Sequence, residues 1–144
     1  LVPRNNLDYL IPFGKAEILR SGSSCTILSC GNMAPLCMEA VNTIEADAEI
    51  IDLRTLDLMD LDWSCITESV KKTNRLIVVE QTSKGPALGA RITQEAQARL
   101  FDWLDHEIVR VCGTDSAPVV SKILESAALA GVEDIVEGIN KVME

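Results

Sequence analysis

The residues with the greatest chemical capacity follow four short apolar segments, which cover residues 25–30, 49–53, 76–79 and 108–112. If these segments are parallel strands, their carboxyl ends meet at one edge of a sheet, which is where open α/β folds bind ligands. The sequence therefore predicts a shared rim of strand ends that contains Gly31, Asn32, Arg54, Glu80 and Asp115.

Four of these residues have both a chemical and a structural interpretation. The backbone amides of Gly31 and Asn32 are able to bind an anion at a helix start, but a tight turn with a capping asparagine accounts for the same pair. Arg54 belongs either to a catalytic pair with Asp52 or to a local ion pair with it. We favour the structural interpretation in both cases. Glu80 is either a general acid whose pKa is raised by burial or a side chain that holds a loop.

The sequence contains no recognisable catalytic or metal centre. His106, the only histidine, falls in an expected exposed loop without a visible partner. The five cysteines are scattered and form no Cys-x-x-Cys pair, which indicates buried free thiols. The stretch 82–90 lacks the Gly-x-x-x-x-Gly-Lys-Ser/Thr order of a phosphate-binding loop. We therefore expect no catalytic residue, no metal ligand and no cofactor bound by this chain.

Helical spacing separates the four apolar segments and adds two helices after them. Apolar residues recur at helical intervals over 33–44, 63–70 and 88–100. Two further helices are expected, one from Ser121 to near Gly131 and one beginning around Val132. Asn32 and Asp62 are placed to cap the first two helices, and Lys71 with Lys72 lies near the negative end of the second.

Strand and helix alternate along the whole sequence. Residues 15–20 alternate weakly and end in a Ser-Gly-Ser-Ser turn, which indicates a short edge strand. Parallel strands need crossover helices, and right-handed crossovers place those helices against the sheet. The predicted fold is a three-layer α/β/α sandwich, with a mostly parallel sheet of about five strands and one antiparallel edge strand.

The chain has 144 residues, 47% of them hydrophobic, and a net charge of -9. This length suits one compact domain. The acidic balance argues against nucleic acid as a partner, because phosphate backbones are held by clustered Lys and Arg. No apolar run approaches the roughly 20 residues of a membrane-spanning helix, so no membrane partner is expected.

The first 13 residues read as a linker from a missing upstream domain, because they hold two prolines and no periodicity. Residues 14–144 then form the predicted domain. Residues 1–4, Leu-Val-Pro-Arg, also match a remnant of a protease-cleavage sequence added for expression, and the sequence does not separate that origin from native linker.

Four segments, in this order, resemble one known family. They are IPFGKA (11–16), IDLRTL (51–56), SVKKTNRL (69–76) and VRVCGTD (109–115). Together they are similar to the carboxy-terminal domain of pyruvate dehydrogenase beta subunits. The resemblance implies a transketolase C-terminal domain-like fold and a role in a 2-oxo acid dehydrogenase. It implies that thiamine diphosphate with magnesium is bound in the full enzyme outside this domain, and that the isolated chain is inactive.

The resemblance also implies partners. They are the alpha subunit, a second beta subunit and the subunit-binding domain of the dihydrolipoyl acyltransferase, in a bacterial cytoplasm or the matrix of a mitochondrion or plastid. Docking is assigned to the carboxy-terminal region, which is rich in acidic residues that suit a basic module. These candidate docking residues are Glu125, Glu133, Asp134, Glu137 and Glu144. A solvated amphipathic helix accounts for the same charges.

Two alternatives stay open at this point. The first is the same domain of a branched-chain 2-oxo acid dehydrogenase, an acetoin dehydrogenase or another enzyme of the transketolase group. The second is a free-standing α/β module that binds a small anion near Gly31 and Asn32.

Overall fold

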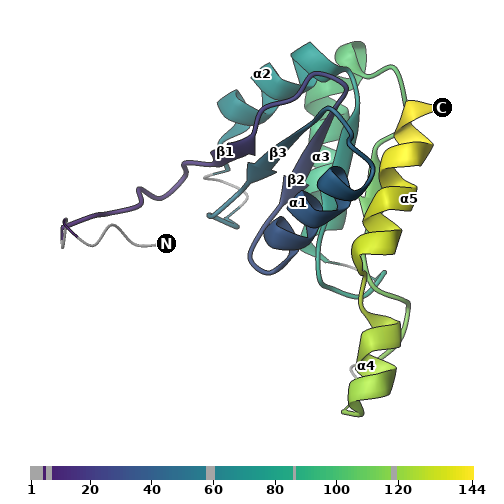
Figure 1. Ribbon diagram of the computed structural model, residues 1–144. Coiled ribbons are helices and arrows are strands. Elements are labelled where there is room, and N and C mark those ends of the chain that lie inside the picture. Colours follow the sequence, from purple (N-terminus) through teal and green to yellow (C-terminus); the bar gives the residue numbers. More distant parts are fainter. Residues whose placement is uncertain (1–4, 6–7, 58–60, 86, 118–119) are drawn as a thin grey trace.

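The chain folds around one five-stranded sheet (Figure 1). The structure is a computed structural model that describes residues 5, 8–57, 61–85, 87–117 and 120–144. The strands lie in the order β1-β3-β2-β4-β5; β1 is antiparallel to β3, and the other pairs are parallel. The predicted mostly parallel sheet with one antiparallel edge strand is confirmed. The strands are β1 (Glu17–Arg20), β2 (Cys25–Ser29), β3 (Ala48–Asp52), β4 (Leu76–Val79) and β5 (Val109–Val111).

Helices cover both faces of the sheet, which confirms the three-layer sandwich (Figure 1). On one face lie α1 (Met33–Thr43) and α5 (Val132–Met143). On the other lie α2 (Trp63–Thr73) and α3 (Leu88–Leu100), and α3 continues into the short 3-10 helix η1 (Phe101–Trp103). The helix α4 (Lys122–Ala128) has no buried residue and extends away from the sandwich in Figure 1.

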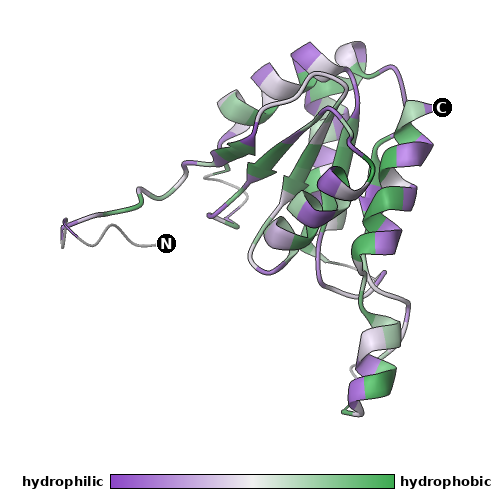
Figure 2. Cartoon of the chain, in the orientation of Figure 1, coloured by the Kyte–Doolittle hydropathy of each residue, from purple (hydrophilic) through white to green (hydrophobic). Residues whose placement is uncertain are grey.

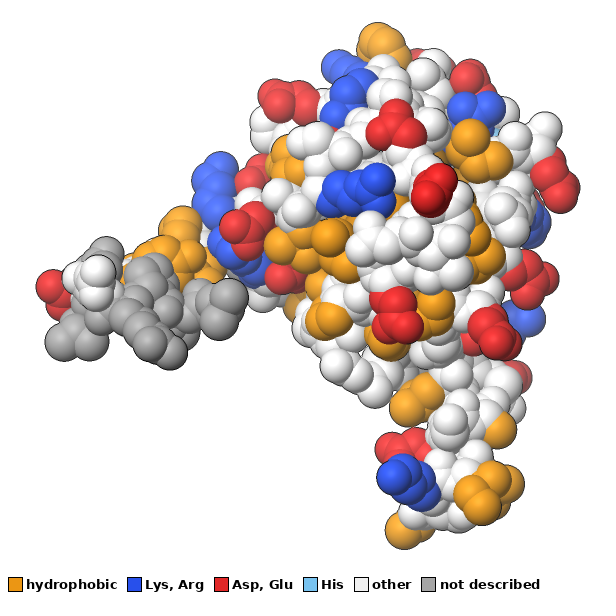
Figure 3. Space-filling model, viewed as in Figure 1, with side chains coloured by type: hydrophobic (Ala, Val, Ile, Leu, Met, Phe, Trp, Pro, Cys, Tyr) orange, Lys and Arg blue, Asp and Glu red, His pale blue; other side chains and the backbone are white. Residues whose placement is uncertain are grey.

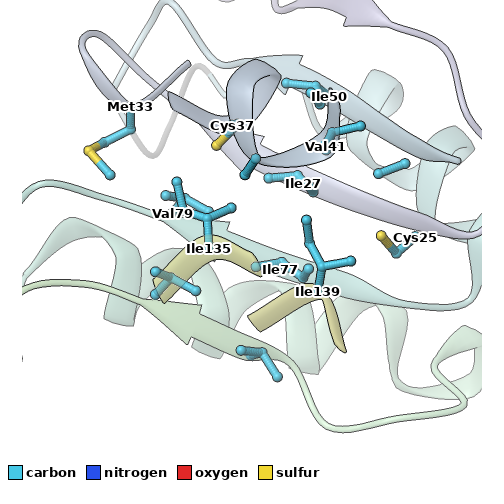
Figure 4. Close-up of a cluster of buried hydrophobic side chains, with 14 of the residues drawn as sticks. Cys25, Ile27, Met33, Cys37, Val41, Ile50, Ile77, Val79, Ile135 and Ile139 are labelled. Atoms are coloured by element: carbon cyan, nitrogen blue, oxygen red, sulfur yellow. The ribbon is translucent and has the colours of Figure 1, made fainter. Parts of the chain in front are cut away.

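The core has two parts because the sheet separates two apolar layers. Ile27, Ile50 and Ile77 on the strands pack with Ile135 and Ile139 of α5 on one side, as Figure 4 shows. Every residue of β2 and β4 is buried, as expected for strands covered on both faces. Figure 2 shows the visible central strands largely in green, whereas the helices alternate between green and purple along their length. The apolar segments therefore form the centre of the sandwich.

The two expected helix caps differ. Asp62 caps α2, because its Oδ1 accepts a hydrogen bond of 3.2 Å from the backbone N–H of Cys65. The prediction that the Asn32 side chain caps α1 was wrong, because Asn32 itself has helical dihedrals and its side chain makes no capping bond. The left-handed backbone of Gly31 (φ 56) makes the turn, and the carbonyl of Cys30 accepts the N–H of Met33.

Two other expectations concern helix ends. Ser121 precedes α4, but its hydroxyl makes no capping bond, and α4 ends at Ala128, ahead of the expected stop near Gly131. Lys71 and Lys72 lie in the last turn of α2, as predicted from the helix dipole. The expectation about the origin of residues 1–4 falls outside the described residues.

Replacing Asp62 should destabilise the domain. We expect Asp62→Ala to lower the free energy of unfolding by about 1 kcal/mol, because the N-terminal amides of α2 lose their acceptor. Asp62 Oδ2 also accepts the N–H of Ala16 at 3.4 Å. Asn32→Ala is the matched control and should change the free energy by less than about 0.5 kcal/mol. Urea unfolding measures both, and equal losses in the two variants would contradict this assignment of caps.

Candidate functional site

The rim residues follow the carboxyl ends of neighbouring parallel strands. Gly31 and Asn32 follow β2, Arg54 follows β3, Glu80 follows β4, and Asp115 lies beyond β5. Glu80 alone is buried, Arg54 is half-buried, and the other three are exposed. The rim is therefore a line of separate local structures, and each has its own partners.

Glu80 holds a loop and the start of a helix. Its Oε1 accepts a hydrogen bond of 2.5 Å from Nε of Arg110 on β5, and its Oε2 accepts one of 2.8 Å from the backbone N–H of Gly89 in α3. A Cβ at Gly89 would overlap the Glu80 carboxylate, so glycine permits this approach. Of the two interpretations left open, the contacts favour the structural one.

Arg110 was missed as a partner in the sequence analysis. Its guanidinium also donates to the carbonyls of Lys84 (2.9 Å), Ser83 (3.2 Å) and Gly85 (3.3 Å). These bonds and the Glu80 contact fix the loop after β4. The signal in the sequence was an arginine between two valines of an apolar strand, because such a charge requires a partner when it is partly buried.

Arg54 pairs with Glu17 of the antiparallel edge strand β1. The expected ion pair with Asp52 was wrong, since Asp52 Oδ1 instead accepts the backbone N–H of Arg54 at 3.1 Å. Arg54 has a left-handed backbone (φ 54), which turns its side chain away from the strand alternation that the prediction assumed. The pair therefore fastens β1 to the loop after β3.

A pocket of about 380 Å³ lies beside the rim, between the loops after β4 and β5 and helix α4. The Gly113 N–H donates to the Thr82 carbonyl and joins the two loops, and the Thr114 N–H donates to the Ala128 carbonyl and joins the loop after β5 to the end of α4; both bonds are 2.8 Å. A Cβ at Gly113 would overlap the Ala128 carbonyl. The lining residues are Gln81, Thr82, Ser83, Thr114, Ser116, Ala117, Glu125, Ala128 and Leu129. The pocket offers hydroxyl groups and one carboxylate.

A second polar cluster is buried beneath α2, and the sequence analysis did not identify it. Glu49 on β3 is 2% exposed and forms an ion pair with Lys72. Beside it, the Thr26 hydroxyl lies 2.6 Å from that of Ser69 and 2.7 Å from that of Thr73. Burial raises the pKa of Glu49, but hydrogen bonds from Lys72 and Ser69 outweigh burial, and the pKa is lowered from its ordinary value. The cluster joins α2 to the sheet through polar contacts.

The cysteines and the histidine are less clearly divided between core and surface than the sequence indicated, because His106 and three of the cysteines are half-buried. The five cysteines, all within the described residues, are free thiols; Cys25 and Cys37 are buried, and the other three are half-buried. Burial raises the pKa of Cys37 to about 12 and that of Cys25 to about 11, so neither is a ready nucleophile. His106 Nδ1 lies 3.2 Å from the carbonyl of Glu107, its neighbour in the chain. Within the described ranges, no three or more Asp, Glu, His or Cys residues are grouped closely enough to hold a metal ion.

The candidate docking residues are all exposed, but they do not form one surface. Glu133 and Glu137 share a face of α5, because residues four apart lie on one side of a helix, and Glu144, the C-cap residue, follows Glu137 by seven residues. Asp134 uses Oδ2 to accept the Gly131 N–H at 2.7 Å, which fixes the start of α5. Glu125 lies on α4 in the pocket wall. We call the set Glu133, Glu137 and Glu144 the acidic face of α5.

Fold and site together define an α/β/α domain whose buried polar residues fasten loops and helices to the sheet. Residues 14–135 match the family described as "Transketolase, C-terminal domain". The chain therefore belongs to the transketolase C-terminal domain family. None of the helices among the described residues has the length and apolar character needed to cross a membrane.

The chain is also similar to individual curated proteins and to a solved structure. The beta subunit of the pyruvate dehydrogenase E1 component from Rickettsia felis is 42% identical over 135 residues, which cover 92% of this chain and 41% of that protein. The mitochondrial E1 beta subunit of Dictyostelium discoideum is 35% identical over 140 residues, covering 95% of this chain and 39% of that protein. A solved structure titled "Split gene transketolase, inactive beta4 tetramer" aligns with a TM-score of 0.74 at 21% identity, covering 94% of this chain and 43% of that one. The chain thus spans about two fifths of the length of these curated relatives.

Proposed function

We propose that this chain is the carboxy-terminal assembly domain of a pyruvate dehydrogenase E1 beta subunit. The main support for this proposal is the match of residues 14–135 to the transketolase C-terminal domain, together with relatives named as this subunit in bacteria and mitochondria. In this role the domain pairs beta subunits, contacts the alpha subunit and serves a complex of the bacterial cytoplasm or an organelle matrix. The shared name of the relatives supports pyruvate over a branched-chain substrate.

Thiamine diphosphate belongs to other parts of the proposed enzyme. A diphosphate requires cationic side chains, clustered N–H groups or a bound metal ion. The pocket at the strand ends has one carboxylate, Glu125, and its wall includes no lysine or arginine. The residues described around this pocket therefore do not fit the diphosphate. In the proposed enzyme this domain contributes surfaces for subunit pairing and docking.

We assign docking of the acyltransferase to the acidic face of α5. Glu133 and Glu137 are exposed on one side of α5 and Glu144 is exposed at its C-cap, while the opposite side of the helix is buried through Ile135 and Ile139. Lys141, on the same helix, is already paired with Glu107 at 2.6 Å. The acidic face therefore presents an excess of negative charge to a basic binding module.

Titration calorimetry tests this assignment. The subunit-binding domain of the acyltransferase is titrated into the assembled E1 enzyme, and the double variant Glu133→Lys/Glu137→Lys should weaken binding about tenfold or more, because reversed charges repel a basic partner. Glu68→Lys is the control, since Glu68 is exposed on α2 in the opposite layer. Unchanged affinity in the double variant would remove this docking assignment and leave subunit pairing in place.

A further inference from the structure

The pocket between the loops after β4 and β5 and helix α4 has a volume of about 380 Å³, and the proposed assembly function does not use it. We call it the strand-end pocket. Its volume lies in the lower part of the range of roughly 300 to 1,000 Å³ that small-molecule sites occupy. Figure 3, in the orientation of Figure 1, shows α4 as a projection below the body of the molecule, and α4 forms one wall of the pocket. The strand-end pocket is therefore large enough for a small organic molecule and lies outside both core layers.

The walls of the strand-end pocket are held by the chain itself. The backbone hydrogen bonds donated by Gly113 and Thr114 close the two loops against each other and against the end of α4. On the other side, the Arg110 guanidinium holds the loop after β4 through the carbonyls of Ser83 at 3.2 Å and Lys84 at 2.9 Å. A ligand does not have to order these loops, which lowers the entropic cost of binding.

Polar side chains around the pocket have hydrogen-bonding capacity to spare. Within the part of the chain that the structure describes, the side chains of Gln81, Thr82 and Ser83 make no hydrogen bond to protein. Glu125 is the only charged residue among the described lining residues, and its carboxylate has no ion-pair partner there. A molecule that enters the pocket therefore meets neutral donors and acceptors and one negative charge.

This lining selects the charge of a ligand. An anion meets the Glu125 carboxylate, no described lysine or arginine in the wall, and the field of a chain with net charge -9. An ammonium group has three N–H donors, which suit a carboxylate and hydroxyl oxygens together. Ala117, Ala128 and Leu129 supply an apolar part of the lining, which suits a short carbon chain.

We propose that the strand-end pocket binds a small organic cation of the amino alcohol class. Its ammonium group pairs with Glu125 on α4, its hydroxyl group bonds to the polar side chains of the loops, and its carbon chain lies along the apolar part of the lining. The bound molecule thus links α4 to the strand ends. This inference goes beyond the proposed function and does not depend on it.

A titration followed by nuclear magnetic resonance tests the site. The 144-residue chain is suitable because its own helices close both core layers. Three probes of one chain length carry a hydroxyl group at one end and differ at the other: aminobutanol is cationic, butanediol is neutral and hydroxybutyrate is anionic. Aminobutanol should bind with a dissociation constant of about 1 mM, butanediol about fivefold more weakly or worse, and hydroxybutyrate not at all.

The position of the shifts is part of the same test. Amide resonances over 81–83, 114–117 and 125–129 should move and saturate with aminobutanol. Equal affinity for the three probes would refute the role of charge, and saturable shifts confined to other segments would refute the site. The absence of saturable shifts at ten times the expected dissociation constant would refute the proposal as a whole.

Matched variants separate the pocket from net charge. Glu125→Gln should weaken aminobutanol binding about fivefold or more and leave butanediol binding unchanged, because the amide keeps its shape but loses its charge. Glu39→Gln removes the same charge from an exposed position on α1 and should change neither affinity. Equal weakening of aminobutanol by both variants would mean that the probe senses only net charge.

A blocking variant and hydrogen exchange give independent readouts. Thr82→Phe, at an exposed lining position, should fill part of the pocket and abolish binding of aminobutanol; retained affinity would place the probe elsewhere. Helix α4 has no buried residue, and a ligand that bridges it to the loops should slow its amide exchange. With aminobutanol at ten times its dissociation constant, exchange over 126–129 should be about tenfold slower, with 63–73 in α2 unchanged. Unchanged exchange over 126–129 at this concentration would show that the ligand does not link α4 to the strand ends.

Discussion

Arg110→Met should lower the free energy of unfolding by about 3 to 5 kcal/mol, the cost of leaving a buried charge without its partner. The Glu80 side chain is 7% exposed and that of Arg110 is 17% exposed, so water does not replace the lost guanidinium. The loop carbonyls of Ser83, Lys84 and Gly85 lose their donors at the same time. Urea unfolding followed by circular dichroism measures the change.

Arg91→Met is the matched control, because Arg91 is exposed on α3. It should change the free energy by less than about 0.5 kcal/mol.

A double variant separates loss of the ion pair from loss of side-chain packing. In Glu80→Gln/Arg110→Met the buried carboxylate is gone, and the neutral amide still has an oxygen that can accept from Gly89 N–H. The double variant should therefore be more stable than Arg110→Met alone. The single variants Glu80→Gln and Arg110→Met each lower the free energy of unfolding by a measured amount. If the double variant lowers it by the sum of these two amounts within about 0.5 kcal/mol, the two side chains are not coupled and Glu80 has another role.

The fold was predictable because local patterns and burial agree. Residues 76–79 are too apolar for a half-exposed sheet, and β4 is buried at every position. The helix 88–100 was expected from its apolar face and has those bounds in the structure. Edge strand β1 was placed by its turn, and its short length matches the three- to four-residue strands found at both edges of this sheet.

The sequence predicted where the rim lies but not which side chains contact each other there. Topology brings strand ends to one edge, but which side chains meet there depends on contacts between residues far apart in the sequence. Glu80 and Arg110 are 30 residues apart, and Glu49 and Lys72 are 23 apart. The Asp52–Arg54 expectation failed for a related reason, since the backbone of Arg54 leaves the strand conformation. Periodicity reports which face of an element is apolar, and it says little about polar partners.

Lys72→Met should destabilise the domain at neutral pH by about 2 kcal/mol, because Glu49 keeps its charge and loses its cation. We place the effect below that of Arg110→Met, since the Lys72 side chain is 44% exposed and solvent screens the pair. Lys71→Met is the control; Lys71 lies 4.7 Å from the centre of the Trp103 ring and does not face the buried carboxylate. Its effect should be below about 1 kcal/mol.

The pH dependence of this difference identifies Glu49 as its source. In the parent chain the folded pKa of Glu49 is lowered, so its contribution to stability is present above the ordinary pKa and is lost as pH falls through the folded value. In Lys72→Met the hydrogen bond from Ser69 still lowers the pKa of Glu49, but the contribution of Lys72 is gone. Burial then raises the folded pKa of Glu49 relative to its value in the parent chain. The variant then gains stability by protonation as pH falls. The difference in free energy of unfolding between parent and variant should therefore shrink from pH 7 to about pH 4. A difference that stays constant over this range would mean that Lys72 acts through packing of its aliphatic chain, because only a titrating partner makes the loss depend on pH.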